Sequence, residues 1–296
     1  MSISFLITIT IAATLMALLY VILKYFQRFE VNNVHGLTFN YITASSFSFL
    51  NNYAQSSAAL EHVGDILIYA FGIGLLFIVV FYIATLTAQY SGITITSIAG
   101  KMSMIIPIAG GILLFHELLN PARIIGIITA LAAVVLSSYP SAQKEEESTA
   151  NKRPVWILPL LLFIGSGMVD LCIKLSEHYL ITTENRTLFI SLLFGSAGII
   201  GILMTLFNYF KNNIRIKAIS ILGGIVLGIT NYYSLEFLIT ALSFPQADSS
   251  MVFSIANVFV VLISVIFALV LFKEKISRIN FAGIFLAILS IIILSA

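Results

Sequence analysis

The sequence predicts an all-α integral membrane protein in which ten transmembrane helices form two inverted five-helix repeats. Hydrophobic residues make up 59% of the 296 residues and charged residues only 9%, against about 25% charged residues in a soluble domain. The apolar runs are roughly 20 residues long, the length that a helix needs to cross the hydrocarbon core. The third observation behind this fold class is an internal duplication.

The duplicated segments are Ser97–Ser138 and Ser254–Ser295, which align without a gap at an offset of 157 residues and are identical at 11 of 42 positions. The identities include Phe115 and Glu117 with Phe272 and Glu274, and Gly126-Ile127 with Gly283-Ile284. Each copy is typical of a membrane helix, a short turn that carries one glutamate, and a second membrane helix. We expect each glutamate to cap or orient the helix that follows it, more than to contact a solute.

Apolar runs and the residues that break them predict the helices in order. The first five are expected at 3–25, 33–53, 64–88, 92–115 and 119–139, and the second five at 154–178, 187–210, 217–243, 247–272 and 276–295. The charged stretch 141–153 is the predicted linker between a first repeat at 1–140 and a second at 154–296. Because five is an odd number, the two repeats must enter the membrane from opposite sides.

Two of these helices need separate comment. Residues 2–23 lack the basic start and the Ala-x-Ala-like end of a cleaved signal peptide, so we expect the first helix to be retained. Helix 33–53 is unusually polar, with Asn40, Ser45 and Asn51 among its residues. We expect this helix to face protein or a cavity, because polar side chains are costly against lipid.

Positive charge predicts the orientation. Outside Lys101 and Lys174, the helix alternation places eleven of the thirteen Lys and Arg residues on one side. These are Lys24, Arg28, Lys144, Lys152, Arg153, Lys211, Arg215, Lys217, Lys273, Lys275 and Arg278, whereas Arg123 and Arg186 lie on the other side. The positive-inside rule then puts the eleven in the cytoplasm and both termini outside.

The chain resembles the drug/metabolite transporter superfamily, specifically the EamA type. The resemblance covers nearly the whole chain, and its most specific elements are Pro107 ten residues before Glu117 and the Phe272-Lys-Glu274 block followed by Gly283. The second copy departs from the first in having Ser264 at the position of Pro107. The resemblance implies a central cavity lined by helices one to four and six to nine, and alternating access by rocking of the two halves. It also implies that both termini lie in the cytoplasm, opposite to the charge count.

Four residues are candidates for binding a solute. Lys101 lies near the middle of an apolar helix, where a charge is costly and therefore indicates either a partner or a function. Asn231 and Tyr232 can donate and accept hydrogen bonds without charge, which suits a polar solute. Asn257 occupies the position that matches Gly100, so both copies place polarity at equivalent depth. The alternatives are that Lys101 braces the bundle, that Asn231 bonds between helices and that the tyrosine is a packing residue.

Four further residues are candidates for coupling or gating. Asp170 and Lys174 lie one helical turn apart in the order acid then base, which favours an ion pair between them. Glu236 follows Asn231 and Tyr232 on the same helix, and Pro107 removes one backbone hydrogen bond from its helix. The alternative for Asp170 and Lys174 is mutual neutralisation without a role in transport.

The function predicted from these residues is secondary active transport of a small polar metabolite, anionic or zwitterionic, such as an amino acid, coupled to protons or to exchange. No nucleotide-binding segment, catalytic constellation, cofactor motif or metal-ligand pattern occurs, and the single Cys172 has no partner for a disulfide or a metal site. The expected partners are the solute, the lipid bilayer of the cell membrane and a coupling proton, with no nucleic acid, in a monomer or homodimer. The alternatives are efflux of lipophilic cations through Asp170 or Glu236, a membrane enzyme acting on lipids, and a membrane protein that does not transport.

Overall fold

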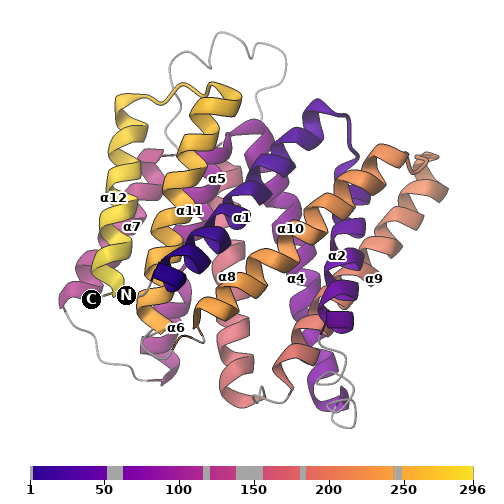
Figure 1. The fold of residues 1–296 in the computed structure, drawn as a ribbon, viewed down its shortest axis with the longest axis horizontal. Coiled ribbons are helices and arrows are strands. Elements are labelled where there is room, and N and C mark those ends of the chain that lie inside the picture. The colour runs from indigo at the N-terminus through magenta and orange to yellow at the C-terminus, as the bar shows by residue number, and fades with distance from the viewer. Residues whose placement is uncertain are drawn as a thin grey trace. The chain divides into compact units, whose positions relative to one another are not determined.

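The computed structural model describes residues 3–51, 63–115, 121–137, 156–180, 185–242, 244 and 249–295, and the regular structure of these residues is helical throughout. The helices, labelled in Figure 1, are α1 (Ile3–Arg28), α2 (Asn33–Asn51), α4 (Val63–Tyr90), α5 (Ile93–Met102), α6 (Ile105–Phe115), α7 (Pro121–Ser137), α8 (Ile157–Tyr179), α9 (Arg186–Asn212), α10 (Ala218–Leu242), α11 (Ser249–Phe272) and α12 (Arg278–Ser295). The predicted linker 141–153 and Glu117 lie outside the described residues.

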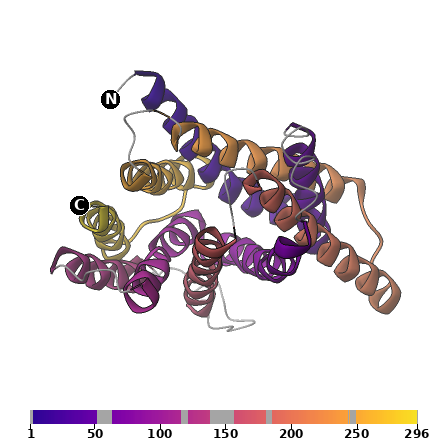
Figure 2. The same cartoon turned by 90° about the horizontal axis from the view of Figure 1, so that it is seen from below.

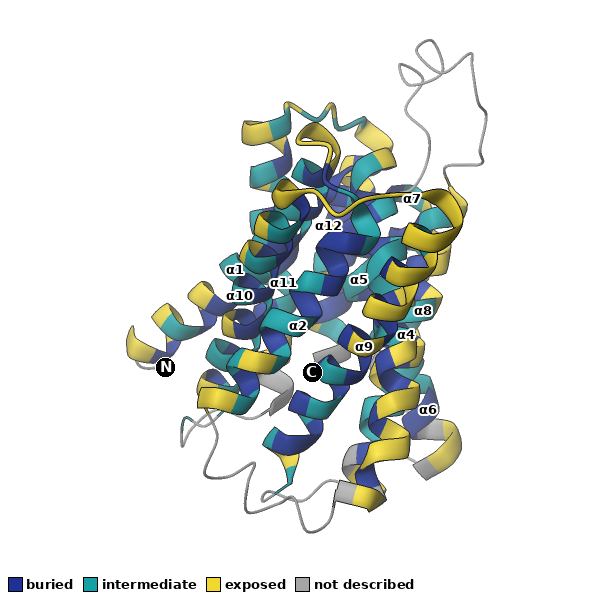
Figure 3. Ribbon diagram, turned by 90° about the vertical axis from the view of Figure 1, so that its right-hand side faces the viewer, coloured by how far each residue is buried: buried dark blue, intermediate teal, exposed yellow. Residues whose placement is uncertain are grey.

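The composition of these helices indicates a multi-pass membrane protein. Among the described residues, seven helical spans are long and apolar enough to cross a membrane: α1, α4, the stretch of α5 and α6, α8, α9, α10 and α11. Large hydrophobic side chains such as Ile68, Phe210 and Phe285 are exposed, as expected of surfaces that contact lipid. Exposed and buried positions recur along the same helix, for example along α9 (Figure 3).

The helices lie close to the ranges expected from the sequence, with one correction. The expected single helix 92–115 is divided into α5 and α6, with a turn at Ser103 and Met104. Pro107 explains the division, because its ring clashes with the carbonyl group four residues earlier and it lacks an N–H. Pro107 is the third residue of α6, a position where the missing N–H has no partner within the helix in any case.

The chain divides into two compact units. The first unit contains Met1–Lys24, Ile83–Met168 and Ser234–Ala296, and the second contains Tyr25–Tyr82 and Val169–Tyr233. The boundaries fall inside α1, α4, α8 and α10. Each unit therefore combines stretches from both predicted repeats, and the division into 1–140 and 154–296 stays a prediction.

In the first unit, the two last helices of the predicted repeats pack along each other. Figures 1 and 2 both show α7 beside α12. A Cβ atom added to Gly283 of α12 would lie 2.5 Å from the backbone nitrogen of Ser137 of α7, so these helices are in backbone contact. α5 packs against α11 in the same unit, and the interior combines Ile98 and Met102 with Val261 and Ile284.

In the second unit, the polar helix α2 packs against α9 and α10. Thr38 is hydrogen-bonded to Thr205 over 3.1 Å, and Ser48 to Ser191 over 2.9 Å, both with α9. A Cβ atom at Gly224 of α10 would lie 2.5 Å from the carbonyl oxygen of Gly36 of α2. Small residues thus let the backbones approach closely, as in other membrane helix pairs. The expectation that this polar helix faces protein is confirmed.

Candidate functional site

The interruption between α5 and α6 places polar backbone inside an apolar stretch of the first unit. The Ile106 N–H donates to the Ser103 carbonyl over 2.9 Å, which is the tighter spacing of a 3₁₀ turn. The Ile108 N–H reaches the Met104 carbonyl over 3.3 Å. Membrane transporters commonly build solute and ion sites at such discontinuous helices, because the interrupted turns expose backbone dipoles.

Lys101 precedes this interruption on α5, and Asn257 of α11 contacts it. The Lys101 Nζ is 3.9 Å from the Met16 Sδ, and the Asn257 Nδ2 is 3.9 Å from the Met104 Sδ. Both side chains are half-buried. A thioether sulfur is a weak acceptor, so a solute oxygen would be a stronger partner for either donor. α5 and α11 contact each other, and the equivalence in depth of the two polar positions stays a prediction.

Asn231 and Tyr232 belong to the second unit, where their side chains meet α2. The Asn231 Nδ2 donates to the Asn40 Oδ1 over 3.3 Å. Tyr232 is 4% exposed, packs against Phe47 and accepts a hydrogen bond of 3.2 Å from the Asn51 Nδ2. These contacts match the packing alternative considered for both residues, and they leave solute binding by them as a prediction.

Asn40 was not singled out from the sequence as a site residue. Its side chain is fully buried, and its Nδ2 has no hydrogen-bond partner among the described residues. The polarity of helix 33–53 was the signal that could have identified it. Asn40 and Asn231 are separated by 191 positions in the sequence, so a local sequence pattern cannot identify them as partners.

The coupling candidates do not gather in one unit. Asp170 is exposed and Lys174 half-buried, one turn apart on α8 in the second unit. Glu236 is half-buried on α10 in the first unit, and its backbone carbonyl accepts a hydrogen bond from Thr240. The eight predicted site residues thus divide into Lys101, Pro107, Glu236 and Asn257 in the first unit and Asp170, Lys174, Asn231 and Tyr232 in the second.

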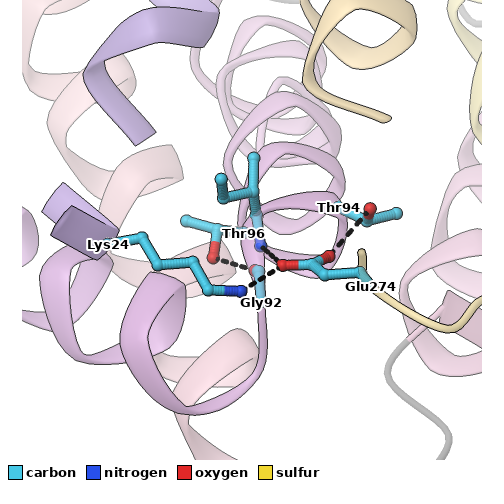
Figure 4. A network of polar contacts seen from close by, with 6 residues as sticks. Lys24, Gly92, Thr94, Thr96 and Glu274 are labelled. Atoms are coloured by element: carbon cyan, nitrogen blue, oxygen red, sulfur yellow. Dashed lines mark hydrogen bonds and ion pairs between the residues drawn. The ribbon is translucent and has the colours of Figure 1, made fainter. Parts of the chain in front are cut away.

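A polar network at one end of the first unit centres on Glu274, just after α11 (Figure 4). Its Oε1 forms an ion pair with the Lys24 Nζ and accepts a hydrogen bond of 2.9 Å from the Ile93 N–H. Its Oε2 accepts one of 3.2 Å from the Thr94 Oγ1. The Lys24 Nζ also lies 4.7 Å from the centre of the Phe272 ring, within the range of a cation–π contact.

The backbone conformations of Gly92 and Lys273 allow the Glu274 carboxylate to reach the start of α5. Gly92, which precedes α5, has φ +104° and offers no side-chain cap, and a Cβ atom there would lie 2.8 Å from the Glu274 carboxylate. Lys273 adopts φ 51°, and the Glu274 N–H donates to the Ala268 carbonyl over 3.0 Å, which closes α11. Glu274 therefore supplies the cap that Gly92 cannot, and its negative charge suits a helix N-terminus.

This arrangement corrects the expectation for Glu274. The helix that it caps is α5, not the following helix α12. The start of α12 is capped by Ser277 and Asn280 instead: the Asn280 N–H donates to the Ser277 Oγ over 3.1 Å, and the Ser277 N–H reaches the Asn280 Oδ1 over 3.3 Å. This reciprocal pair is a capping box. Lys24, which entered the sequence analysis only through the charge count for orientation, is the partner that sequence reasoning missed.

The described residues contain no group of three or more His, Cys, Asp or Glu side chains that could hold a metal ion. Cys172 is a free, half-buried thiol on α8.

Comparison with known proteins gives a relative and a shared fold. No model of a known protein family matches the chain. An uncharacterized protein of Haemophilus influenzae is 27% identical over 279 residues, which cover 92% of this chain and 91% of that protein. A protein of known crystal structure aligns with a TM-score of 0.55 at 12% identity, over 95% of this chain and 96% of the other. At that identity the likeness concerns the fold.

Proposed function

We propose that this protein is a secondary active transporter that moves a small anionic or zwitterionic solute, such as an amino acid, across the cell membrane by alternating access. The observation that carries the proposal is the interrupted helix α5–α6, with Lys101 just before the break and Asn257 of α11 directed at Met104 within it. Interrupted helices at the interface of structural repeats form the solute sites of many secondary transporters.

The helix contacts support the ten-helix inverted repeat that this proposal assumes. Two-fold symmetry places an element beside its own counterpart wherever the axis passes. In the first unit α5 contacts its counterpart α11, and α7 contacts its counterpart α12. In the second unit α2 contacts its counterpart α9. This pattern agrees with the resemblance to the EamA-type drug/metabolite transporters.

The charge of Lys101 defines the proposed class of solute. An ammonium group at membrane depth costs about 2.5–3.5 kcal/mol on the insertion scale, so a lysine at that depth indicates a function or a structural role. A carboxylate or phosphate oxygen of a solute would form a charge-assisted hydrogen bond, roughly twice as strong as a neutral one. Asn257 would bind a second oxygen, and the aliphatic parts of Met16 and Met104 would contact an apolar portion of the solute.

The remaining candidates have secondary roles in this proposal. Asn231 and Tyr232 add neutral hydrogen-bonding groups, Asp170, Lys174 and Glu236 serve in proton coupling or gating, and Pro107 maintains the interruption. The coupling is to protons or to a counter-solute, and the functional form is a monomer or homodimer. From the charge distribution we propose that both termini lie outside the cytoplasm, opposite to what the resemblance implies.

The test is the thermal stability of the purified protein against amino acids, sugar phosphates, nucleotide sugars and organic cations. A ligand at 100 times its dissociation constant adds about 2.7 kcal/mol of stability. We expect an anionic or zwitterionic ligand whose effect is lost in Lys101→Met and kept in the matched control Lys211→Met, an exposed lysine. Uptake into proteoliposomes then tests transport. Stabilisation by lipophilic cations alone would contradict the proposal and favour efflux through Asp170 or Glu236.

A further inference from the structure

We infer that the Glu274 network is a latch that holds one end of the transport route closed and opens once in each cycle. This inference rests on the proposed transport function. The latch consists of Lys24 at the end of the first-unit part of α1, Ile93 and Thr94 at the start of α5, and Glu274 after α11. It joins segments of the two predicted repeats, which is the place where alternating access requires a reversible contact.

The latch has the burial expected of a contact that is both strong and reversible. The side chains of Lys24 and Glu274 are 19% and 16% exposed, so the pair is screened less than a surface ion pair but remains within reach of water. When the two separate, both charges can be hydrated. By comparison, Lys217 and Glu30 in the second unit form a 3.8 Å pair with side chains 65% and 84% exposed, and such pairs contribute little.

The position of the latch connects it to the proposed solute site. α5 is a half-helix of ten residues, held by Glu274 at its first residue and ending at the interruption after Met102. Lys101 lies eight residues after Ile93, about 12 Å along the helix axis. Release of the N-terminus by Glu274 therefore frees a short rigid segment that carries Lys101 at its other end.

The latch also has a predicted side. In the sequence, Lys24 and Glu274 lie within a few positions of Arg28, Lys273 and Lys275, basic residues that are predicted from the charge distribution to be cytoplasmic. A latch that is closed in this structure thus closes the predicted cytoplasmic end.

The experiment measures access to the site without any solute. A reporter cysteine, Asn257→Cys in a Cys172→Ser background, is labelled with a membrane-impermeant maleimide applied to either face of oriented vesicles. We expect Glu274→Gln and Lys24→Met to raise the labelling rate from the face that carries the basic loops about ten-fold, which corresponds to about 1.4 kcal/mol. The rate from the opposite face should stay constant or fall. Glu30→Gln, which breaks the exposed pair, is the matched control and should leave both rates unchanged.

Rates that match the control would overturn the latch, as would equal increases from both faces, which indicate general loosening. If Glu274→Gln does not fold, Lys24→Met and Thr94→Val remain, and the second removes one hydrogen bond to Glu274 while keeping both charges, so a smaller increase is expected. Failure of the latch leaves solute binding to the wild-type protein intact. Failure of the proposed function is instead seen as the absence of any stabilising solute for the wild-type protein.

Discussion

The side-chain amide of Asn280, in the first turn of α12, donates a 2.7 Å hydrogen bond to the carbonyl oxygen of Ser137, the last residue of α7. The same nitrogen reaches the Leu136 carbonyl over 3.3 Å, and the Asn280 oxygen accepts the Ser277 hydroxyl over 2.6 Å. One buried side chain therefore bonds both to the C-terminal end of α7 and to the N-terminal cap of α12. It bonds to backbone groups at the ends of both helices, where such groups have no partner within their own helix.

Replacement of this side chain should destabilise the first unit. Asn280→Ala leaves the Leu136 and Ser137 carbonyls without this donor and removes half of the α12 cap, so we expect a loss of about 1–3 kcal/mol. Equilibrium unfolding of the purified protein in mixed micelles measures it. Asn212→Ala is the control, because Asn212 is exposed and its amide donates to the Asn208 side chain of the same helix over 3.3 Å. The expected effect of this control is within about 0.5 kcal/mol. Equal losses would contradict the assigned role.

Close backbone contact predicts a second effect in the same helix pair. A Cβ atom at Gly283 would lie 2.5 Å and 2.9 Å from the backbone nitrogen and Cα of Ser137, and backbone atoms cannot move away without separating the helices. We expect Gly283→Ala to destabilise by about 1–3 kcal/mol in thermal unfolding. Gly72→Ala on α4 meets nothing within 4 Å and should be neutral or slightly stabilising. If Gly283→Ala left the stability unchanged, α7 and α12 would not be in the close backbone contact described here.

The sequence predicted the helices well, because the length of an apolar run is a direct physical requirement for crossing a bilayer. The burial of α2 followed from its polarity for the same kind of reason. The interruption at Ser103 and Met104 was not predicted as a helix end, although Pro107 had been singled out. A proline is compatible with the first turn of a helix, and the flanking residues are apolar, so the pattern does not fix where α5 stops.

The polar networks were only half predictable. The duplication drew attention to Glu274, but its partner Lys24 lies 250 positions away, and the choice of α5 as the helix to be capped depends on how α11 packs. Asn231 was identified, whereas its partner Asn40 was not. A local sequence pattern identifies polar residues within apolar helices, but which of these residues contact each other depends on the tertiary packing.

The hydroxyl contact between α2 and α9 offers a test in the second unit. The Thr38 hydroxyl donates to the Val34 carbonyl over 2.8 Å, so it accepts the hydroxyl proton of Thr205 over 3.1 Å. A double-mutant cycle of Thr38→Val and Thr205→Val should give a coupling energy of about 0.6 kcal/mol, the average for hydrogen bonds between membrane helices. Thr205→Val paired with Ser46→Ala, whose hydroxyl is exposed and bonds within its own helix, should be additive. Zero coupling in the first cycle would contradict the bond.

The amide pair of Asn40 and Asn231 separates a packing role from a solute-binding role. Asn231→Leu removes the hydrogen bond to the Asn40 Oδ1, and the Asn40 Nδ2 already has no partner among the described residues. Leaving the buried amide unpaired costs about 1–3 kcal/mol, whereas replacing both partners by apolar groups of similar shape is nearly neutral. We therefore expect Asn231→Leu to lower the melting temperature and the double variant Asn40→Leu/Asn231→Leu to recover part of the loss.

Solute binding then distinguishes the two roles. If Asn231 contacts the solute, as proposed, the double variant regains stability without regaining the stabilisation that the solute gives to the wild-type protein. Full recovery of both would assign Asn231 to packing alone and confine the solute site to the groups around Lys101 and Asn257. Thermal unfolding of the four proteins, with and without the solute identified by the stability screen, measures both quantities in one experiment.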